Sequence, residues 1–334
     1  MKTITKDIQP YTELPKGEFV NLSLDYAGQL LVLISINLIG NRKGINESNS
    51  VKTNRDQPKT YQIWQTKDNS NALSLYAEIR AEVNFDNVQR HSNGDILLFN
   101  SRSQYRSEND YDKNGYIYSI DGELKQQLPL GDGVAEVQVT KNDIIWISYF
   151  DQGIFDGRYS SNWYDILSST GLVAQATDGR KLYEFEPSDG LCLMDDCYSL
   201  NVSSNTTTYA YYFYNYYNNC GGEFDLVRIQ NYEINNYWHM PVSGSSAFII
   251  DGNKAVFDGG YHHRTLFYLV ELQNDHQAQI TKQIIFEHDG ENILKIGEGF
   301  SYPRSRGDSF VVIKNRYLFV IPFAEFSSKE TSVS

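Results

Sequence analysis

Six oxygen-bearing side chains, Ser245 and the five candidate ligands named below, occupy comparable places in the sequence, each seven to nine residues before a short polar turn. Carboxylate and amide oxygens are the ligands that Ca²⁺ and other hard divalent cations prefer. A cation held by such a set would polarise a carbonyl group or activate water. If the fold brings these places to one axis, the sequence predicts a site for Ca²⁺ or a similar cation. The alternative is that each side chain caps its own strand or hydrogen-bonds a neighbouring one. The candidate ligands are Asn21, Asn87, Glu136, Asp196 and Asp308.

A second candidate for chemistry is the segment that contains Asp258, His262 and His263. A histidine beside a carboxylate can act as a general base, so Asp258 and His262 are the candidate catalytic pair. Successive residues on a strand point to opposite faces, so at most one of the two histidines can serve a site. The alternative is a histidine that only packs in a loop. The chain has no glycine-rich phosphate loop, no His-Glu-x-x-His motif and no Gly-x-Ser-x-Gly elbow.

Four long polar segments, residues 40–59, 100–114, 151–170 and 212–223, each contain Asn together with Arg, aromatic residues or both. Tyrosine and tryptophan give rigid contact area with a polar tip, and this mixture is typical of protein or carbohydrate recognition. Two arginines in a later segment could bind a carboxylate or phosphate. The alternative is that the aromatic rings pack on one another and only order the loops. The candidate binding residues are Tyr105, Arg106, Tyr159, Trp163, Tyr164, Tyr216, Arg304 and Arg306.

The elements that must position these residues are six hairpins of one pattern: a short strand, a tight polar turn and a strongly apolar strand. Turns of the Asn-Gly and Asp-Gly kind between apolar runs are the strongest short-range hairpin signal. A second hairpin follows most of the first ones, which predicts four strands in each of six repeats. The sequence therefore predicts an all-β, six-bladed β-propeller with four-stranded antiparallel blades. The six turns are Ala27-Gly28, Asn93-Gly94, Asn142-Asp143, Ser204-Asn205, Asp251-Gly252 and Lys314-Asn315.

The last repeat begins its hairpin at Phe310 and ends soon after Pro322, so its outer two strands are missing. We expect the N-terminal residues 2–14 to supply one or both of them and so to close the ring. Residues 1–326 would then form one domain, with 327–334 as a flexible tail. The alternative is a large β-sandwich or two stacked β-domains.

In an antiparallel blade the tight turns gather on one face and the long connections on the other. Functional side chains usually lie on loops that a rigid scaffold positions, so the long-loop face is the expected functional face.

The stretch 131–202 resembles a family of uncharacterised bacterial β-propeller proteins. The similarity is carried by the runs that begin at Gly131 (Gly-Asp-Gly-Val-Ala-Glu-Val-Gln), Trp146 (Trp-Ile-Ser-Tyr-Phe-Asp-Gln-Gly), Gly171 and Asp195. The resemblance implies a propeller fold and no particular activity, because fold does not decide function.

The amino-acid composition limits which classes of binding partner and which cellular compartments are compatible with the chain. The chain has 42 acidic against 29 basic residues and a formal charge of −13, which disfavours binding to nucleic acid or to anionic membranes. Residues 1–19 lack an apolar core, and residues 30–39 are too few to span a bilayer. The three cysteines, Cys192, Cys197 and Cys220, describe neither a disulfide framework nor a zinc site. These observations predict a cytoplasmic protein.

The leading functional hypothesis is a non-enzymatic recognition or scaffold protein that binds a macromolecular partner through its long-loop face. The alternative is a metal-dependent hydrolase or lactonase that uses the axial carboxylates. The absence of a known catalytic motif favours the first hypothesis.

Overall fold

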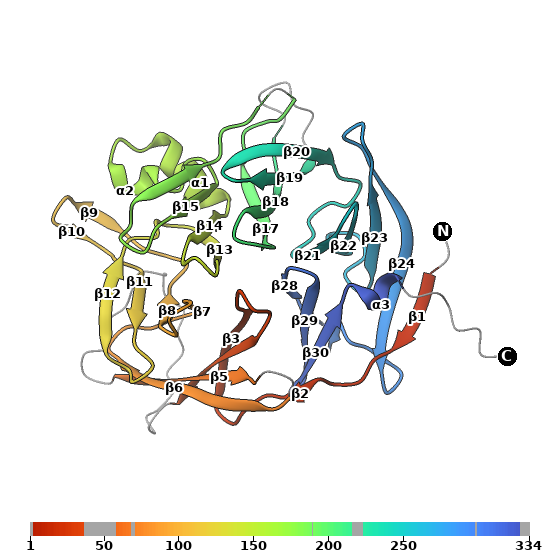
Figure 1. The fold of residues 1–334 in the computed structure, drawn as a ribbon, viewed down its shortest axis with the longest axis horizontal. Coiled ribbons are helices and arrows are strands. Elements are labelled where there is room, and N and C mark those ends of the chain that lie inside the picture. The colour runs from red at the N-terminus through yellow and green to blue at the C-terminus, as the bar shows by residue number, and fades with distance from the viewer. Residues whose placement is uncertain are drawn as a thin grey trace.

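The computed structural model describes residues 3–36, 58–67, 71–188, 190–215, 223–297 and 299–327. Among the described residues, six sheets of four or more strands are arranged like blades around a common axis, and the chain passes from one blade to the next around the ring (Figure 1). The predicted six-bladed β-propeller is therefore confirmed.

The first four blades are four-stranded antiparallel sheets whose strands follow one another in sequence from the axis outward. Blade one contains β3 (Glu18–Leu24), β4 (Leu30–Ile36), β5 (Lys59–Thr66) and β6 (Leu73–Ala81), and blade two contains β7 (Asn87–Arg90), β8 (Ile96–Phe99), β11 (Gly115–Tyr118) and β12 (Leu124–Leu128). Blade three contains β13 (Val134–Val139), β14 (Ile145–Tyr149), β15 (Leu172–Gln175) and β16 (Lys181–Glu184), and blade four contains β17 (Asp196–Val202), β18 (Thr207–Phe213), β19 (Phe224–Gln230) and β20 (Glu233–His239).

The last two blades share the N-terminal segment. Blade five contains β21 (Phe248–Asp251), β22 (Lys254–Asp258), β23 (Phe267–Leu272) and β24 (Ala278–His288), with β25 (Glu291–Asn292) paired to the end of β24. Blade six contains β28 (Arg304–Arg306), β29 (Ser309–Lys314), β30 (Tyr317–Pro322) and, as its outermost strand, β2 (Thr12–Glu13). The strand β1 (Thr3–Asp7) lies parallel to β24 at the outer edge of blade five (Figure 1).

Ring closure by the N-terminal segment is thus present, but its details differ from the expectation. Blade six lacks one strand rather than two, because the short polar segment β28 is its innermost strand. The hairpin that starts at Phe310 forms the second and third strands. Asp308 consequently lies in the turn between β28 and β29, and its prediction as the first residue of an innermost strand is wrong.

In the described part of the chain the core consists of six apolar clusters, and each one joins two neighbouring blades. Every inner strand is therefore covered on both faces, which explains why β4 is apolar at nearly every position instead of alternating. In β14, Trp146 and Tyr149 are buried as predicted, and Phe150, just after the strand, is half-buried.

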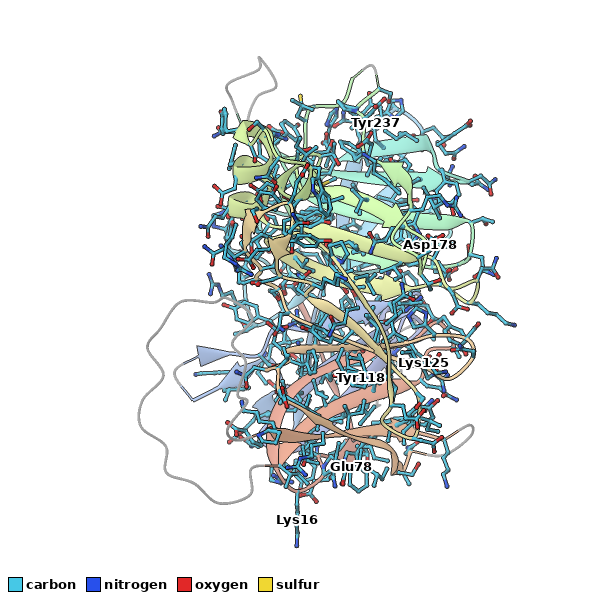
Figure 2. The ribbon with its side chains drawn as sticks, turned by 90° about the vertical axis from the view of Figure 1, so that its left-hand side faces the viewer. Lys16, Glu78, Tyr118, Lys125, Asp178 and Tyr237 are labelled. Atoms are coloured by element: carbon cyan, nitrogen blue, oxygen red, sulfur yellow. The ribbon has the colours of Figure 1, made fainter. Side chains whose placement is uncertain are left out.

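Several insertions stand on the long-loop face of this scaffold. Between β8 and β11 lies a small hairpin of β9 (Tyr105–Ser107) and β10 (Asp110–Tyr111), and between β14 and β15 lie helices α1 (Asp151–Tyr159) and α2 (Trp163–Ile166). Figure 2 shows these helices on one side of the ring and Asp178 and Lys125, in or after tight turns, on the other. The remaining short elements are β26 (Lys295–Ile296), β27 (Gly299–Phe300) and α3 (Ala324–Ser327). No helix among the described residues has the length and apolar character needed to cross a bilayer.

Candidate functional site

The predicted axial residues mostly bind the neighbouring blade. Glu136 accepts a hydrogen bond of 3.1 Å from the backbone amide of Leu200 on the next inner strand. Burial among these strands raises the pKa of the Glu136 carboxyl. In the same way, Asn21 donates hydrogen bonds to the backbone oxygen of Asp86 (2.9 Å) and to the side-chain oxygen of Asn87 (2.7 Å). These side chains therefore join blades one to two and three to four.

Asp196 and Asp308 lie at opposite ends of the inner strands. Asp196 is the first residue of β17, at the long-loop end, and burial together with the charge of Asp151 raises its pKa to about 7. Asp308 follows β28 at the tight-turn end and accepts a hydrogen bond from the hydroxyl of Ser309. The fold therefore does not gather the predicted carboxylates at one point.

The centre of the ring is filled by side chains. Arg306 is 6% exposed, and burial lowers its pKa to about 10. Its guanidinium donates to the backbone oxygens of Leu24 and Val139 and to the side-chain oxygen of Gln89. The expectation that Arg306 would bind an anion on the long-loop face is wrong, because Arg306 ends an inner strand at the opposite end of the axis. Arg304, two residues earlier, is exposed.

A cavity of about 30 Å³ remains along the axis, with Glu136, Gln138, Asn87 and Arg304 among its lining residues. That volume holds a water molecule and no larger ligand. In the described part of the chain no group of three or more His, Cys, Asp or Glu side chains could hold a metal ion.

The two residues of the predicted catalytic pair, Asp258 and His262, lie in different surroundings. The Asp258 carboxylate accepts bonds from the hydroxyl of Ser245, both the amide and the hydroxyl of Ser246, and the amides of Ala247 and Gly260. Burial raises the pKa of Asp258. His262 is exposed and lies in a turn rather than on a strand. Among the described residues no hydrogen bond or ion pair joins His262 to Asp258, so the carboxylate orders a loop.

The predicted binding residues on blades two and three do come together. Tyr105, Tyr111, Trp163 and Tyr164 form one aromatic cluster with ring centroids 5.2–6.4 Å apart. Tyr164 is fully buried, and its hydroxyl donates a 2.6 Å bond to the backbone oxygen of Asp112. The β9–β10 hairpin is therefore packed on α2, so that part of the aromatic set orders the loops, as the alternative interpretation held.

Arg106 belongs to the same hairpin and is engaged by its own neighbours. Its guanidinium lies 2.8 Å from carboxylate oxygens of both Asp110 and Asp112. Trp163 and Tyr159, by contrast, are 44% and 87% exposed, so these two rings face outward beside the cluster. Tyr216 lies outside the described residues.

Two glycines seat α1 against the loop that begins blade three. A Cβ atom on Gly133, whose φ is +76°, would lie 2.5 Å from the Cα of Gly153, and a Cβ on Gly153 would lie 2.4 Å from the backbone oxygen of Asp132. Only glycine permits so close an approach of two backbones. The helix therefore stands directly on the edge of blade three and carries Tyr159 at its C-terminal end.

Between the β9–β10 hairpin and α1 lies a pocket of about 760 Å³ on the long-loop face. This recognition pocket is mainly polar. Tyr105 and Tyr159 are its aromatic residues, and Asp156 is an exposed carboxylate beside them. The full lining is Arg102, Ser103, Gln104, Tyr105, Asp132, Gln152, Gly153, Asp156, Gly157, Tyr159, Ser160, Asp165 and Ser168.

Arg102 connects the two walls of the recognition pocket. It pairs with Asp132 at 2.9 Å, donates a 2.7 Å hydrogen bond to Gln152, and lies 5.4 Å from the ring centroid of Phe150. Burial raises the pKa of Asp132, and the charge of Arg102 opposes that effect. Because Arg102 is already paired, the carboxylates of Asp156 and Asp165 leave the pocket with an excess of negative charge.

Sequence reasoning placed Arg102 on a candidate functional loop without naming it as a binding residue, and it missed Gln104, Asp132, Gln152 and Asp156 as site residues. Arg102 and Gln104 lie inside one predicted loop, and Gln152 and Asp156 lie inside another. These residues can be recognised as lining one pocket only when the folded structure brings the two loops together. Asp132 lies in the Gly-Asp-Gly run that carried the family resemblance, which was the one available signal.

No family model matches this chain, and no curated protein matches it. Among solved structures the chain is similar to a gluconolactonase from Xanthomonas campestris, with a TM-score of 0.43, 10% identity and coverage of 94% of this chain and 98% of that one. It is also similar to the β-propeller domain of the trilobed protease from Pyrococcus furiosus (TM-score 0.41, 10% identity, 93% and 84% coverage) and to apo AztD from Citrobacter koseri (0.42, 9%, 93% and 85%). Likeness of this size carries no argument about what this chain binds or catalyses.

Proposed function

We propose that this protein is a non-enzymatic recognition propeller that binds a macromolecular partner through the recognition pocket and the exposed rings beside it. The observation that carries the proposal is the pocket itself. Two insertions that are not part of the blade scaffold enclose it, and Tyr159 stands beside it with 87% of its surface exposed. Rigid aromatic side chains in the centre of a polar rim are the usual anchors of protein interfaces.

The charge of the molecule favours a basic or neutral partner. Asp156 and Asp165 outweigh the paired Arg102 inside the recognition pocket, and the whole chain carries −13. A field of this sign speeds association with positively charged proteins and suppresses association with acidic ones. A basic protein is therefore the preferred partner class, ahead of a carbohydrate.

A comparative capture experiment tests the proposal. Wild-type protein and the double variant Tyr159→Ala, Trp163→Ala are immobilised and exposed to extract from the source organism, and bound proteins are quantified. A matched control is Ile120→Ala, Leu124→Ala, which removes two exposed apolar side chains from the β11–β12 hairpin on the opposite face. We expect one basic protein to bind the wild type and the control and to be lost from the Tyr159, Trp163 variant.

Salt dependence provides the second measurement. Binding of that protein should weaken as salt rises, because the attraction is between charges that are partly exposed. Equal capture by all three proteins would contradict the proposal, as would an acidic partner whose binding does not respond to salt.

The metal-dependent hydrolase has no comparable support. Its three predicted carboxylates are divided between the two ends of the axis, and the axial cavity of about 30 Å³ is too small for a substrate. The relationship to uncharacterised bacterial propellers remains part of this proposal and rests on residues 131–202 alone.

A further inference from the structure

A second pocket, of about 520 Å³, lies at the rim of the ring between blades three and four. All four residues of the outer strand β16 line it, together with Glu186 and Ser188. Its other wall is formed by Tyr232, in the turn between β19 and β20, and by Glu233 and Ile234 at the start of β20. It shares no lining residue with the recognition pocket, so it is a separate feature of the surface. We call it the rim pocket.

The backbone of the rim pocket contains an unfavourable residue. Asn231 and Tyr232 form the two-residue loop between β19 and β20, with φ angles of +52° and +65°. Two positive φ angles define the turn type that suits tight hairpins, and asparagine tolerates it well. A bulky aromatic residue in the left-handed region is an outlier, and glycine would avoid the strain. Such outliers occur preferentially where a side chain serves a function.

The strained turn places the Tyr232 ring on an aromatic wall. Tyr232 stacks on Trp146 with centroids 6.1 Å apart and planes 21° apart, and on Tyr183 at 6.4 Å and 28°. Trp146 is buried beneath, while Tyr232 keeps 41% of its surface exposed. The wall therefore combines a rigid base with an exposed ring in a fixed orientation.

Carboxylates surround this wall. Glu184 is paired with Lys181. Glu186 and Glu233 are exposed, and neither has a hydrogen bond or ion pair with another side chain in the described part of the chain. Burial raises the pKa of the Tyr183 hydroxyl, and the negative charge of Glu186 raises it further. The rim pocket consequently offers two carboxylates to an incoming cation.

The edge of blade three supplies backbone groups along the same pocket. β16 pairs with β15 on one side, and in the described structure no strand pairs with its other side. An unpaired edge can accept an extended peptide as an additional strand. Because every residue of β16 lines the rim pocket, such a peptide would pass directly along it.

We infer that the rim pocket binds an arginine side chain carried by an extended segment of a partner protein. The planar guanidinium group stacks on aromatic rings and forms forked hydrogen bonds with carboxylates, so it matches the Tyr232 ring and the carboxylates of Glu186 and Glu233 together. A lysine side chain matches the charge but neither the planar stacking nor the fork. This site goes beyond the proposed function, because it uses a different surface.

Three short peptides that differ at one residue test the inference. The probe is an acetylated and amidated Thr-Val-Arg-Val-Thr peptide with a fluorescent label, and the comparison peptides carry citrulline or lysine in place of arginine. Binding to the full-length protein is measured by fluorescence anisotropy at low salt. We expect the arginine peptide to bind about three- to tenfold more tightly than the citrulline peptide, because citrulline keeps the shape and loses the charge. We expect the lysine peptide to fall between them.

Two variants connect the binding to this pocket. Glu186→Gln should weaken arginine-peptide binding about three- to tenfold and leave citrulline-peptide binding unchanged. Tyr232→Gly should remove the preference for arginine over lysine while the protein stays folded, because glycine suits the positive φ angle. The matched control is Glu123→Gln. It changes an exposed glutamate in the β11–β12 turn of blade two, which corresponds to the β19–β20 turn of blade four, and this variant should bind like the wild type.

Specific results would overturn the inference. Equal binding of the arginine and citrulline peptides would exclude recognition of charge, and equal binding of the lysine peptide would exclude recognition of the guanidinium group. Wild-type binding by Glu186→Gln would place the peptide elsewhere on the protein. Unfolding of Tyr232→Gly would assign the strained ring a purely structural role between the blades.

Discussion

The guanidinium of Arg306 donates a 2.6 Å hydrogen bond to the backbone oxygen of Val139, which joins the innermost strand of blade six to that of blade three. The same strand is joined to blade three again where Gln138 donates a 3.1 Å bond to the backbone oxygen of Ser305. Blade six therefore reaches into the centre of the ring. Its short inner strand satisfies backbone groups that would otherwise face an empty axis.

Replacing Arg306 by alanine should destabilise the protein by about 3–5 kcal/mol, because three buried acceptors lose a charged donor at once. Urea-induced unfolding measures the change. Arg304→Ala is the matched control, since Arg304 is exposed two residues earlier on the same strand, and it should shift stability by less than about 1 kcal/mol. Similar losses in the two variants would show that the axial hydrogen bonds of Arg306 are not important for stability.

Deleting residues 1–14 should lower the free energy of unfolding by about 2–5 kcal/mol, because β2 completes blade six and Leu14 is buried between blades six and one. Deleting only residues 1–8 removes β1 and should have a smaller effect, since blade five keeps its own four strands. Thermal unfolding of the two truncated proteins distinguishes the contributions. An unchanged midpoint for the longer deletion would contradict closure of the ring by this segment.

The raised pKa of Asp196 predicts that this group's contribution to the stability of the folded protein falls as pH rises. Burial and the neighbouring Asp151 raise its pKa from 3.8 to about 7, so the folded protein holds a proton that the unfolded chain releases. The stabilisation from this group is complete below about pH 4 and is lost as pH rises through about 7. Melting temperatures measured from pH 5 to 8 should therefore decline less in Asp196→Asn than in the wild type. Asp308→Asn, in the tight turn between β28 and β29, is the control; equal pH profiles for all three proteins would refute the assignment.

The states of Cys192 and Cys197 predict which thiols react with an alkylating reagent, and they bear on the cellular compartment in which the protein resides. Cys197 is a free buried thiol, whereas Cys192 is disulfide-bonded. Alkylation of the denatured, unreduced protein followed by mass spectrometry should therefore label Cys197 and leave Cys192 unlabelled. Disulfides persist in oxidising compartments and are rare in the cytosol. A labelled Cys192 in protein isolated from its native compartment would contradict the disulfide and favour the cytoplasmic location that the sequence predicts.

Much of the scaffold could be predicted from residues that are close together in the chain. The turns at Gly28, Gly94 and Gly252 have the positive φ angles that their sequences indicate, and the strands on either side pair as expected. Turn geometry and strand pairing across two to six residues depend on local conformational preferences. Six such hairpins with apolar strands are compatible with few architectures, so the propeller followed from the sequence alone.

The recognition pocket could be predicted only in part. The sequence identified Tyr105, Tyr159, Trp163 and Tyr164 as one functional set, and the structure brings Tyr105, Trp163 and Tyr164 into one cluster beside a pocket that Tyr105 and Tyr159 line. It did not indicate that Tyr164 is buried while Tyr159 is exposed, since both rings have the same chemistry. Burial is a property of the packed loops, and two insertions separated in the sequence by the four strands β11 to β14 must meet before it is defined.

The arrangement of strands at the central axis could not be predicted from the sequence and depends on tertiary structure alone. β28 has three residues and no apolar alternation, so nothing local marks it as a strand, and Phe310 was the first residue with a strand signal. Its place at the centre depends on hydrogen bonds between residues 167 positions apart, such as Arg306 with Val139. Local sequence determines which segments form hairpins. Only closure of the ring determines which polar strand is needed to satisfy the backbone groups at its centre, because those groups exist together only in the folded protein.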